Sequence, residues 1–351
     1  MSLIPTLTET ISRARADLRI GLPVVIGGYL AAAAETVSSD RVATMLALGP
    51  AVLAVTGWRA ETLKARVYDG DLARIEVPPD ADLGWMRAVA DPSTDLMTPM
   101  KGPFHTQRGG DSRAQLAAIM LAKSARLLPA MLMVNAAEPG LPNLPPQAVI
   151  DTLAAEAVLH PVAAARLPLE ASEHSRLHIF RPEDGGIEHY AVEIGDPSRS
   201  EPPLARLHSA CFTGDVLGSL KCDCGPQLHA ALATMGGAGE GVLLYLNQEG
   251  RGIGLANKMR AYALQNQGFD TVEANHRLGF EDDERDFRIG AEMLREMGFS
   301  GVRLMTNNPR KVEMLQSHGI DVVERVPLIL PPNRFNRDYL ATKAAKSGHL
   351  L

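Results

Sequence analysis

The sequence contains no long hydrophobic run and no N-terminal apolar segment of the secretory type. No uninterrupted apolar stretch approaches the roughly 20 residues that a membrane-spanning helix requires. The opening residues, MSLIPTLTETISRARADL, are acidic and polar where a signal peptide has an apolar core. We therefore expect no membrane association and a cytoplasmic location, in which cysteine thiols stay reduced.

An excess of positive charge is also absent. The 35 Lys and Arg residues are outnumbered by 41 Asp and Glu residues, which gives a net charge of −6. This balance argues against a nucleic-acid partner, although a local basic cleft can still bind a nucleotide. The hydrophobic content of 46% and the charged content of 22% are ordinary for a folded globular protein. A length of 351 residues suggests two domains.

Cysteine is scarce, and its three copies, Cys211, Cys222 and Cys224, fall within one 14-residue window. Free cysteine is often a small buried hydrophobe, but Cys222 and Cys224 lie in the polar sequence LKCDCG. An odd count without a secretory signal argues against disulfides. A catalytic zinc ion takes three protein ligands and leaves a fourth position for water. We therefore favour zinc or another soft metal over structural thiols.

The first half of the sequence predicts strands alternating with helices, and so a layered α/β fold. Its apolar periodicity indicates a helix over residues 4–18 and another over the alanine-rich residues 30–48. LPVVIGG and AVLAVTG are typical of short buried strands. Shorter helices are expected over residues 59–65 and 115–127.

The second half follows the proline-rich residues 133–149, and we place the boundary near Ala165. GEGVLLYLNQEGRGIGLANKMRAYALQNQG predicts a strand, a glycine loop and a helix. Gly250, Gly252 and Gly254 allow the backbone to approach a ligand closely, and the N-terminus of the next helix is a natural anion site. The spacing matches neither a P-loop nor G-x-G-x-x-G, so an unliganded turn stays an alternative.

Two further segments place charges near helix starts. The acidic loop of residues 281–286 contains Asp283 and Arg285, which suit acid–base or phosphate chemistry but are also typical of a solvated helix start. Arg310 and Lys311 follow a Thr-Asn-Asn-Pro turn. Cations in the first turn of a helix oppose its dipole, which indicates another role such as phosphate binding.

Five segments resemble GTP cyclohydrolase II, in order and with matching spacing, over about residues 165–351. They are RLHSACFTGD with LKCDCG, YLNQEGRGIGLANKMRAYALQNQGFDTVEAN, LGFEDDERDF, LMTNNPRKVEML and VERVPL. The resemblance implies a GTP cyclohydrolase II-like fold, a homodimer, and an enzyme that opens GTP at C8 with release of formate and pyrophosphate. This reaction leaves a diaminopyrimidinone ribosyl phosphate and is the first step of riboflavin biosynthesis.

The same resemblance implies roles for the residues that match the family motifs. One zinc ion per subunit would be bound by Cys211, Cys222 and Cys224. Asp283 would accept protons, Tyr262 would lie near the reacting centre, and Arg285 would act at the α-phosphate. We favour charge stabilisation for this arginine, because a guanidinium stays protonated and is a poor nucleophile. Magnesium would accompany the triphosphate. The expected substrate contacts are Arg206, Leu207, His208, Ser209, Ala210, Gln227, Glu249, Gly250, Arg251, Thr271, Thr306 and Lys311.

The first half resembles a different family of the same pathway. GLPVVIGGYLAAAAETVSSDRVATM is similar to the opening strand and helix of a 3,4-dihydroxy-2-butanone 4-phosphate synthase domain. That family has an acidic, magnesium-binding run after the strand, whereas this sequence has only Gly27-Gly28-Tyr29. The resemblance implies that residues 1–150 form a degenerate, inactive domain, followed by a catalytic domain at residues 165–351. An unrelated α/β domain is the alternative.

Two departures from the cyclohydrolase pattern keep other functions open. Ala210 stands where the family usually has glutamate beside the first cysteine, and Asn247 stands where arginine is common. A paralogous zinc hydrolase acting on another nucleotide or base is therefore the main rival. A non-catalytic zinc or nucleotide-binding module is disfavoured, because a structural zinc site has four protein ligands and this sequence offers three cysteines. A dinucleotide-dependent dehydrogenase is disfavoured because its acidic ribose-binding residue is missing.

Overall fold

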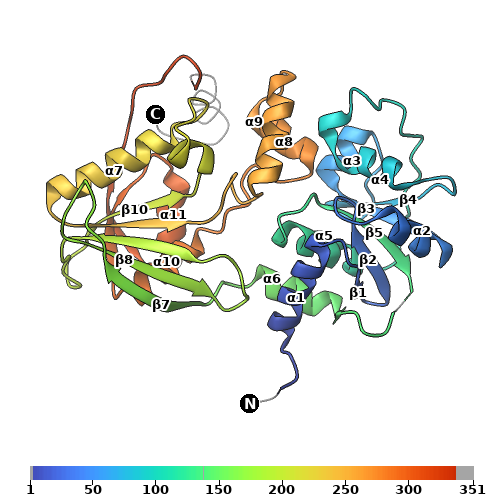
Figure 1. Ribbon diagram of the computed structural model, residues 1–351, viewed down its shortest axis with the longest axis horizontal. Coiled ribbons are helices and arrows are strands. Elements are labelled where there is room, and N and C mark those ends of the chain that lie inside the picture. Colours follow the sequence, from blue (N-terminus) through green and yellow to red (C-terminus); the bar gives the residue numbers. More distant parts are fainter. Residues whose placement is uncertain (1–2, 137, 337–351) are drawn as a thin grey trace. The chain divides into compact units, whose positions relative to one another are not determined.

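The computed structural model describes residues 3–136 and 138–336 and divides into two compact units (Figure 1). Unit 1 comprises Met1–Ala155 together with Ile253–Glu284, and unit 2 comprises Glu156–Gly252 together with Arg285–Leu351. Each unit has its own β-sheet with helices packed on it, which confirms the predicted mixed α/β class with two parts. The assignment of residues 1–150 to a degenerate synthase-like domain and of residues 165–351 to a catalytic domain stays a prediction.

Unit 1 is built on a six-stranded sheet with the order β4-β3-β5-β2-β1-β6. Neighbouring strands are antiparallel except β1 and β6, which are parallel. The strands are β1 (Val24–Ile26), β2 (Tyr29–Ala33), β3 (Ala51–Thr56), β4 (Leu72–Glu76), β5 (Ala130–Asn135) and β6 (Asn143–Leu144). The proline-rich residues 133–149 contribute β6, the short strand at one edge of this sheet.

Several helices of unit 1 begin at recognisable capping residues. Thr6 and Glu9 form a capping box at the start of α1, and Ser38 caps α2. Asp270 and Glu273 form a second capping box, at the start of α9. The helices are α1 (Leu7–Arg19), α2 (Ser39–Ala47), α3 (Gly57–Leu63), α4 (Leu83–Ala90), η1 (Pro92–Thr94), α5 (Arg113–Ser124), α6 (Pro146–Ala154), α8 (Leu255–Asn266) and α9 (Thr271–Leu278).

The helix predicted over residues 30–48 is wrong in its first half. Residues 29–33 form β2, and the helix α2 begins only at Ser39. Alanine favours helices intrinsically, but β2 lies between β1 and β5 and pairs with both. Ala31, Ala32 and Ala33 are almost completely buried there, so pairing across the sheet overrides local propensity.

Unit 2 is built on a seven-stranded sheet with the order β13-β12-β10-β11-β9-β8-β7. The strands β8 and β9 pair as an antiparallel hairpin around residues 183–186. The strands are β7 (Leu159–Arg166), β8 (Ser175–Pro182), β9 (His189–Ile194), β10 (Leu204–Ser209), β11 (Gly241–Leu246), β12 (Gly301–Met305) and β13 (Asp321–Val326). The helical segments are η2 (Phe212–Val216), α7 (Cys224–Ala238), α10 (Arg288–Glu296) and α11 (Pro309–Ser317).

The strand β10 lies inside the sheet of unit 2, between β12 and β11. It pairs in parallel with β11 on one side and with β12 on the other. The carboxyl ends of these three strands therefore meet at one edge of the sheet, where open α/β sheets bind their ligands. The chain leaves that edge at Ala210, Asn247 and Thr306, so the motifs after each strand begin there.

None of the helices in the described part of the chain combines the length and the apolar character that crossing a membrane would require.

We predict that Leu244→Ala lowers the free energy of unfolding of unit 2 by about 2–5 kcal/mol, because it leaves a cavity in a closed core. Leu244 is completely buried in β11 and pairs with Leu207 of β10. Equilibrium unfolding in urea measures the loss. Val323→Ala, at a 53% exposed position of β13, is the control and is expected to change stability by less than about 0.5 kcal/mol. Equal effects of the two substitutions would contradict this assignment of the core.

Candidate functional site

The three cysteines converge on one point of unit 2. Cys211 follows β10, and Cys224 is the first residue of α7. Their sulfur atoms and that of Cys222 all lie within 4.8 Å of one another, and this trio is the group that could hold a metal ion within the described residues. Cys211 and Cys222 are buried, and Cys224 is partly exposed. The cluster therefore has the donor set and the enclosure of a metal centre.

The spacing of the sulfur atoms fits a tetrahedral ion. The Sγ atoms of Cys211 and Cys222 are 3.7 Å apart, and zinc–sulfur bonds of about 2.3 Å place two tetrahedral ligands about 3.8 Å apart. Hydrogen bonding to Cys211 and then to Cys222 raises the pKa of the Cys224 thiol, and burial adds to the effect. Three thiols crowded in this way resist ionisation unless a cation compensates their charge.

Gly214 makes room for this cluster. A Cβ atom at this position would lie 2.8 Å from the sulfur of Cys222 and 3.1 Å from that of Cys211. The backbone N–H of Gly214 points at the sulfur of Cys211, with N and S 3.3 Å apart. A side chain at position 214 would therefore displace the thiols, and the N–H group favours the thiolate form.

Asp215 is a functional candidate that motif reasoning missed. Its buried carboxylate accepts hydrogen bonds from the backbone N–H of Cys211 at 2.9 Å and from the hydroxyl of Tyr245 at 2.9 Å. It also lies 3.1 Å from Nε2 of His208. Asp215 thus connects a predicted substrate contact with a predicted metal ligand. The sequence signal that could have identified Asp215 was its acidic side chain between Cys211 and Cys222.

Arg206 presents a buried guanidinium next to the cluster. Its terminal nitrogens donate to the carbonyl of Met305 at 3.1 Å and to the side chain of Gln227. Its Nε and the Oε1 of Gln248 are buried and have no partner among the residues that the structure describes. Burial lowers the pKa of Arg206 to about 10, so the group stays charged at neutral pH. A buried cation with an unused donor is suited to an anionic or polar ligand.

Two more cations lie near the end of β10. Lys311 donates from Nζ to the carbonyl of Leu207 at 2.8 Å, and Arg285 donates to the hydroxyl of Ser209 at 3.3 Å. The ring of Phe287 lies between them, 4.8 Å from Nζ of Lys311 and 4.7 Å from the guanidinium carbon of Arg285. The unusual cation in the first turn of α11 is therefore directed to β10 rather than to solvent.

The glycine loop is connected to the cysteine window by Glu249. This carboxylate accepts from the backbone N–H of Phe212 at 2.6 Å and from that of Gly250 at 3.0 Å. Arg251 has a φ of 61°, a left-handed conformation that is rare outside glycine. Such strain persists only where the surroundings impose it, and it is concentrated at functional sites.

The Thr-Asn-Asn-Pro turn has a structural explanation. Asn308 caps α11 by accepting from the N–H of Arg310, and Pro309 occupies the first helical position. Asn307 is bonded to the backbone of Leu328 in both directions. Thr306 is buried, and its hydroxyl accepts from the N–H of Asn308. The turn thus holds the end of β12 in place beside β10.

Three predicted site residues belong to unit 1 and not to unit 2. Tyr262 lies on α8, Thr271 is the first residue of α9, and Asp283 follows α9. The hydroxyl of Thr271 accepts from the side chain of Gln265 at 3.2 Å, and the ring of Tyr262 lies 5.7 Å from Nζ of Lys258. The other predicted residues all belong to unit 2.

The two residues that depart from the family pattern, Ala210 and Asn247, both form hydrogen bonds within unit 2. Ala210 donates its backbone N–H to Leu246 at 2.8 Å and brings no charge to the cluster. Asn247 donates its side-chain amide to the carbonyl of Glu188 and its backbone N–H to His189. Asn247 therefore ties the end of β11 to the turn before β9.

The fold and the cluster define a mixed α/β protein. Its three thiols and the buried cations Arg206 and Lys311 lie at the edge where parallel strands end. The family model described as GTP cyclohydrolase II matches residues 160–327. A protein of Azospirillum brasilense named GTP cyclohydrolase-2 is 45% identical over 98% of this chain and 94% of its own length. The chain belongs to the GTP cyclohydrolase II family.

Two further comparisons cover different shares of the chain. GTP cyclohydrolase-2 of Cronobacter sakazakii is 58% identical over 54% of this chain and 96% of its own length. A solved structure from A. baumannii, described as RibBX, a two-domain 3,4-dihydroxy-2-butanone 4-phosphate synthase, aligns with 91% of this chain and 99% of that chain. Its sequence identity is 14% and its TM-score is 0.29.

We predict that Asp215→Asn weakens metal retention by about 10–100-fold, the usual cost of losing a group that orients a metal ligand. The amide loses the charge that holds the backbone of Cys211 and the hydroxyl of Tyr245. Competition with a chromophoric chelator measures the change. Asp321→Asn, at an exposed position of β13, is the matched control. Unchanged retention in Asp215→Asn would show that Asp215 does not orient the cluster.

Proposed function

We propose that this protein is a zinc-dependent GTP cyclohydrolase II that opens the imidazole ring of GTP at C8 and releases formate and pyrophosphate. Such a reaction is the first step of riboflavin biosynthesis. The observation that carries the proposal is the three-cysteine cluster at the carboxyl end of β10, in a chain of this family. Three ligands leave the open position that a catalytic zinc ion requires.

The zinc ion, when bound, supplies a Lewis acid and lowers the pKa of its water toward about 7. Cys211, Cys222 and Cys224 hold it, and Asp215 keeps the first of them in position. Enclosure of the thiols favours this role, because it excludes bulk water from the reacting centre.

The cations near β10 bind the nucleotide. The buried guanidinium of Arg206 has an unused donor, and Arg285 and Lys311 add positive charge beside the strand end. These groups suit the triphosphate, which magnesium would accompany. Arg285 stabilises charge on the phosphoryl group during pyrophosphate release, because its guanidinium does not deprotonate to become a nucleophile.

The remaining roles follow from the family motifs. Asp283 accepts the proton, and Tyr262 lies near the reacting centre. The nucleotide is also contacted by a set of residues at the strand ends and in the loops: Leu207, His208, Ser209, Ala210, Gln227, Glu249, Gly250, Arg251, Thr271 and Thr306. The protein acts as a cytoplasmic homodimer.

We predict that Cys222→Ser abolishes both metal binding and GTP ring opening, because a serine hydroxyl does not replace a thiolate as a zinc ligand. The wild-type protein, loaded with zinc and supplied with magnesium and GTP, is expected to produce formate and pyrophosphate in equal amounts. Metal content by elemental analysis and both products are measured on the same samples.

Ser219→Ala, inside the cysteine window but outside the cluster, is the control for this substitution. Full turnover by metal-free Cys222→Ser would overturn the zinc mechanism. A zinc-loaded wild-type protein that releases neither product would instead favour the paralogous hydrolase, whose support is Ala210 and Asn247.

We predict that the purified protein does not convert ribulose 5-phosphate, because its first half has Gly27-Gly28-Tyr29 in place of an acidic magnesium-binding run. Assay of dihydroxybutanone phosphate in the presence of magnesium tests this. Formation of that product at a rate proportional to protein concentration would show that the first half is an active synthase.

A further inference from the structure

The α8–α9 segment (residues Ile253–Glu284) lies within the core of unit 1 although it belongs, by sequence, to the cyclohydrolase family match. Six apolar side chains of the segment share one buried cluster with strands β3 and β4 of the N-terminal half. They are Ile253, Ala261, Leu264, Ala274, Leu278 and Phe280. The N-terminal half therefore supplies the apolar surface on which this segment folds.

The helix α8 is also fixed by polar contacts to the N-terminal half. Arg260 donates from Nε to Asp91 and from a terminal nitrogen to Glu35, both at 3.0 Å. Asn257 is completely buried and donates to the carbonyl of Arg126 at 3.1 Å. These contacts fix the helix that carries Tyr262.

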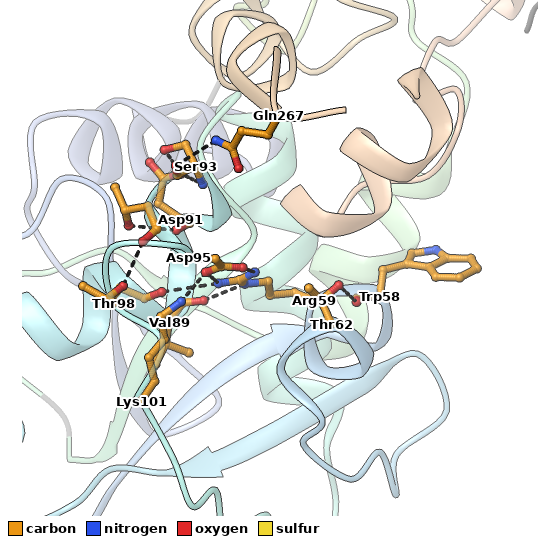
Figure 2. Close-up of polar contacts among 12 residues, drawn as sticks. Trp58, Arg59, Thr62, Val89, Asp91, Ser93, Asp95, Thr98, Lys101 and Gln267 are labelled. Carbon is orange, nitrogen blue, oxygen red and sulfur yellow. Dashed lines mark hydrogen bonds and ion pairs between the residues drawn. The ribbon is translucent and has the colours of Figure 1, made fainter. Parts of the chain in front are cut away.

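Arg59 of α3 holds the chain segment against which α8 rests. Its guanidinium makes two bonds of 2.8 Å to Asp95 and a bond of 2.7 Å to the carbonyl of Val89. Figure 2 shows this network together with Gln267, whose amide donates to the carbonyl of Ser93 at 3.3 Å. The side chain of Arg59 is 1% exposed, so the segment around η1 is rigidly supported.

Two side chains of the N-terminal half, Trp58 and Lys123, contact the loop after α9. Trp58 of α3 stacks on His276 with ring centroids 3.7 Å apart and donates to Glu281 at 3.0 Å. Lys123 of α5 donates to Glu284 at 2.6 Å. Asp283 lies between these two anchored positions.

Gly279, where α9 ends, allows the close approach. A Cβ atom there would lie 2.7 Å from the hydroxyl of Thr56 and 2.9 Å from the ring of Pro129, and its φ is 87°. The segment between α9 and Asp283 is therefore fitted to the surface formed by α3 and the start of β5.

We propose that the N-terminal half is a positioning domain for the cyclohydrolase site, in which Trp58 and Lys123 hold the loop that carries Asp283. This inference rests on the proposed function for the role of Asp283, but the anchoring itself is independent of it. A lost synthase activity and a retained domain are then compatible, because the domain supports α8, α9 and the loop rather than a reaction of its own.

The test exchanges the charges of the Lys123–Glu284 pair in the full-length, zinc-loaded protein. Lys123→Glu and Glu284→Lys are each expected to lower kcat for formate release about tenfold or more, because misplacing a reacting group by about 1 Å can cost about 100-fold. The double exchange restores the attraction but not the bond that Glu284 accepts from the backbone N–H of Glu281 at 2.9 Å, so we expect it to recover part of the loss. Zinc content stays unchanged in all three proteins.

Trp58 offers a graded second test. Trp58→Ala removes both the stacking on His276 and the bond to Glu281, whereas Trp58→Phe keeps an aromatic ring. We expect a larger loss of kcat for alanine than for phenylalanine, with KM changed less than kcat. Arg113→Ala is the control, because it removes an exposed ion pair on the same helix as Lys123 and is expected to leave kcat unchanged.

Hydrogen exchange supplies a readout that does not depend on activity. Lys123→Glu and Trp58→Ala are expected to speed exchange in residues 271–284 and to leave residues 211–224 unchanged. If the wild type is active and the segment loosens without loss of kcat, the inference is wrong. It is also wrong if hydrogen exchange does not change, or if the double charge exchange recovers none of the lost kcat. An inactive zinc-loaded wild type would contradict the proposed function alone, and exchange would still test the anchoring.

Discussion

The position of β10 between two parallel neighbours is the constraint on which unit 2 depends. Because β11 and β12 both run parallel to it, three strand ends and the loops that follow them open at one edge. The cysteine window, the glycine loop and the turn before α11 are far apart in sequence. They become neighbours because the hydrogen-bond register of β10 places Ser209 opposite Leu246. Any ligand chemistry at this edge uses residues from all three loops.

Charge balance is the second constraint at this edge. The three thiols are crowded and largely buried, and their mutual hydrogen bonds oppose ionisation. The carboxylates of Asp215 and Glu249 add negative charge near the window, where both accept hydrogen bonds from its backbone N–H groups. In the proposed function a bound metal ion compensates the thiols, and Arg206, Arg285 and Lys311 bind the nucleotide.

The division into units changes how the N-terminal half is understood. In the sequence, the N-terminal half and the cyclohydrolase match follow one another. In the structure, residues 253–284 of that match pack in unit 1 with the N-terminal half. In the role that we propose, the N-terminal half supports the loop beside Asp283 through contacts from its helices α3 and α5.

Local pattern predicted much of the secondary structure, including the strand at residues 241–246 and the helix α8 that follows its glycine loop. It failed where long-range pairing decided the outcome, as in the alanine-rich residues 29–33, which lie inside a sheet. The strand β7 was not anticipated, because most of its residues are exposed and carry no clear apolar alternation. The short helix α9 was also missed, although Asp270 and Glu273 carry the sequence signature of a capping box.

For the site, the sequence by itself determined the donor set and the motifs, because residue type and spacing are local properties. Cys211, Cys222 and Cys224 were recognisable from count and context alone. The tertiary structure alone decided that Asp215 joins them, that Arg206 is buried with an unused donor, and that Tyr262, Thr271 and Asp283 are held by the N-terminal half. These facts depend on which side chains are buried against one another. Burial is a property of the whole fold rather than of any one segment.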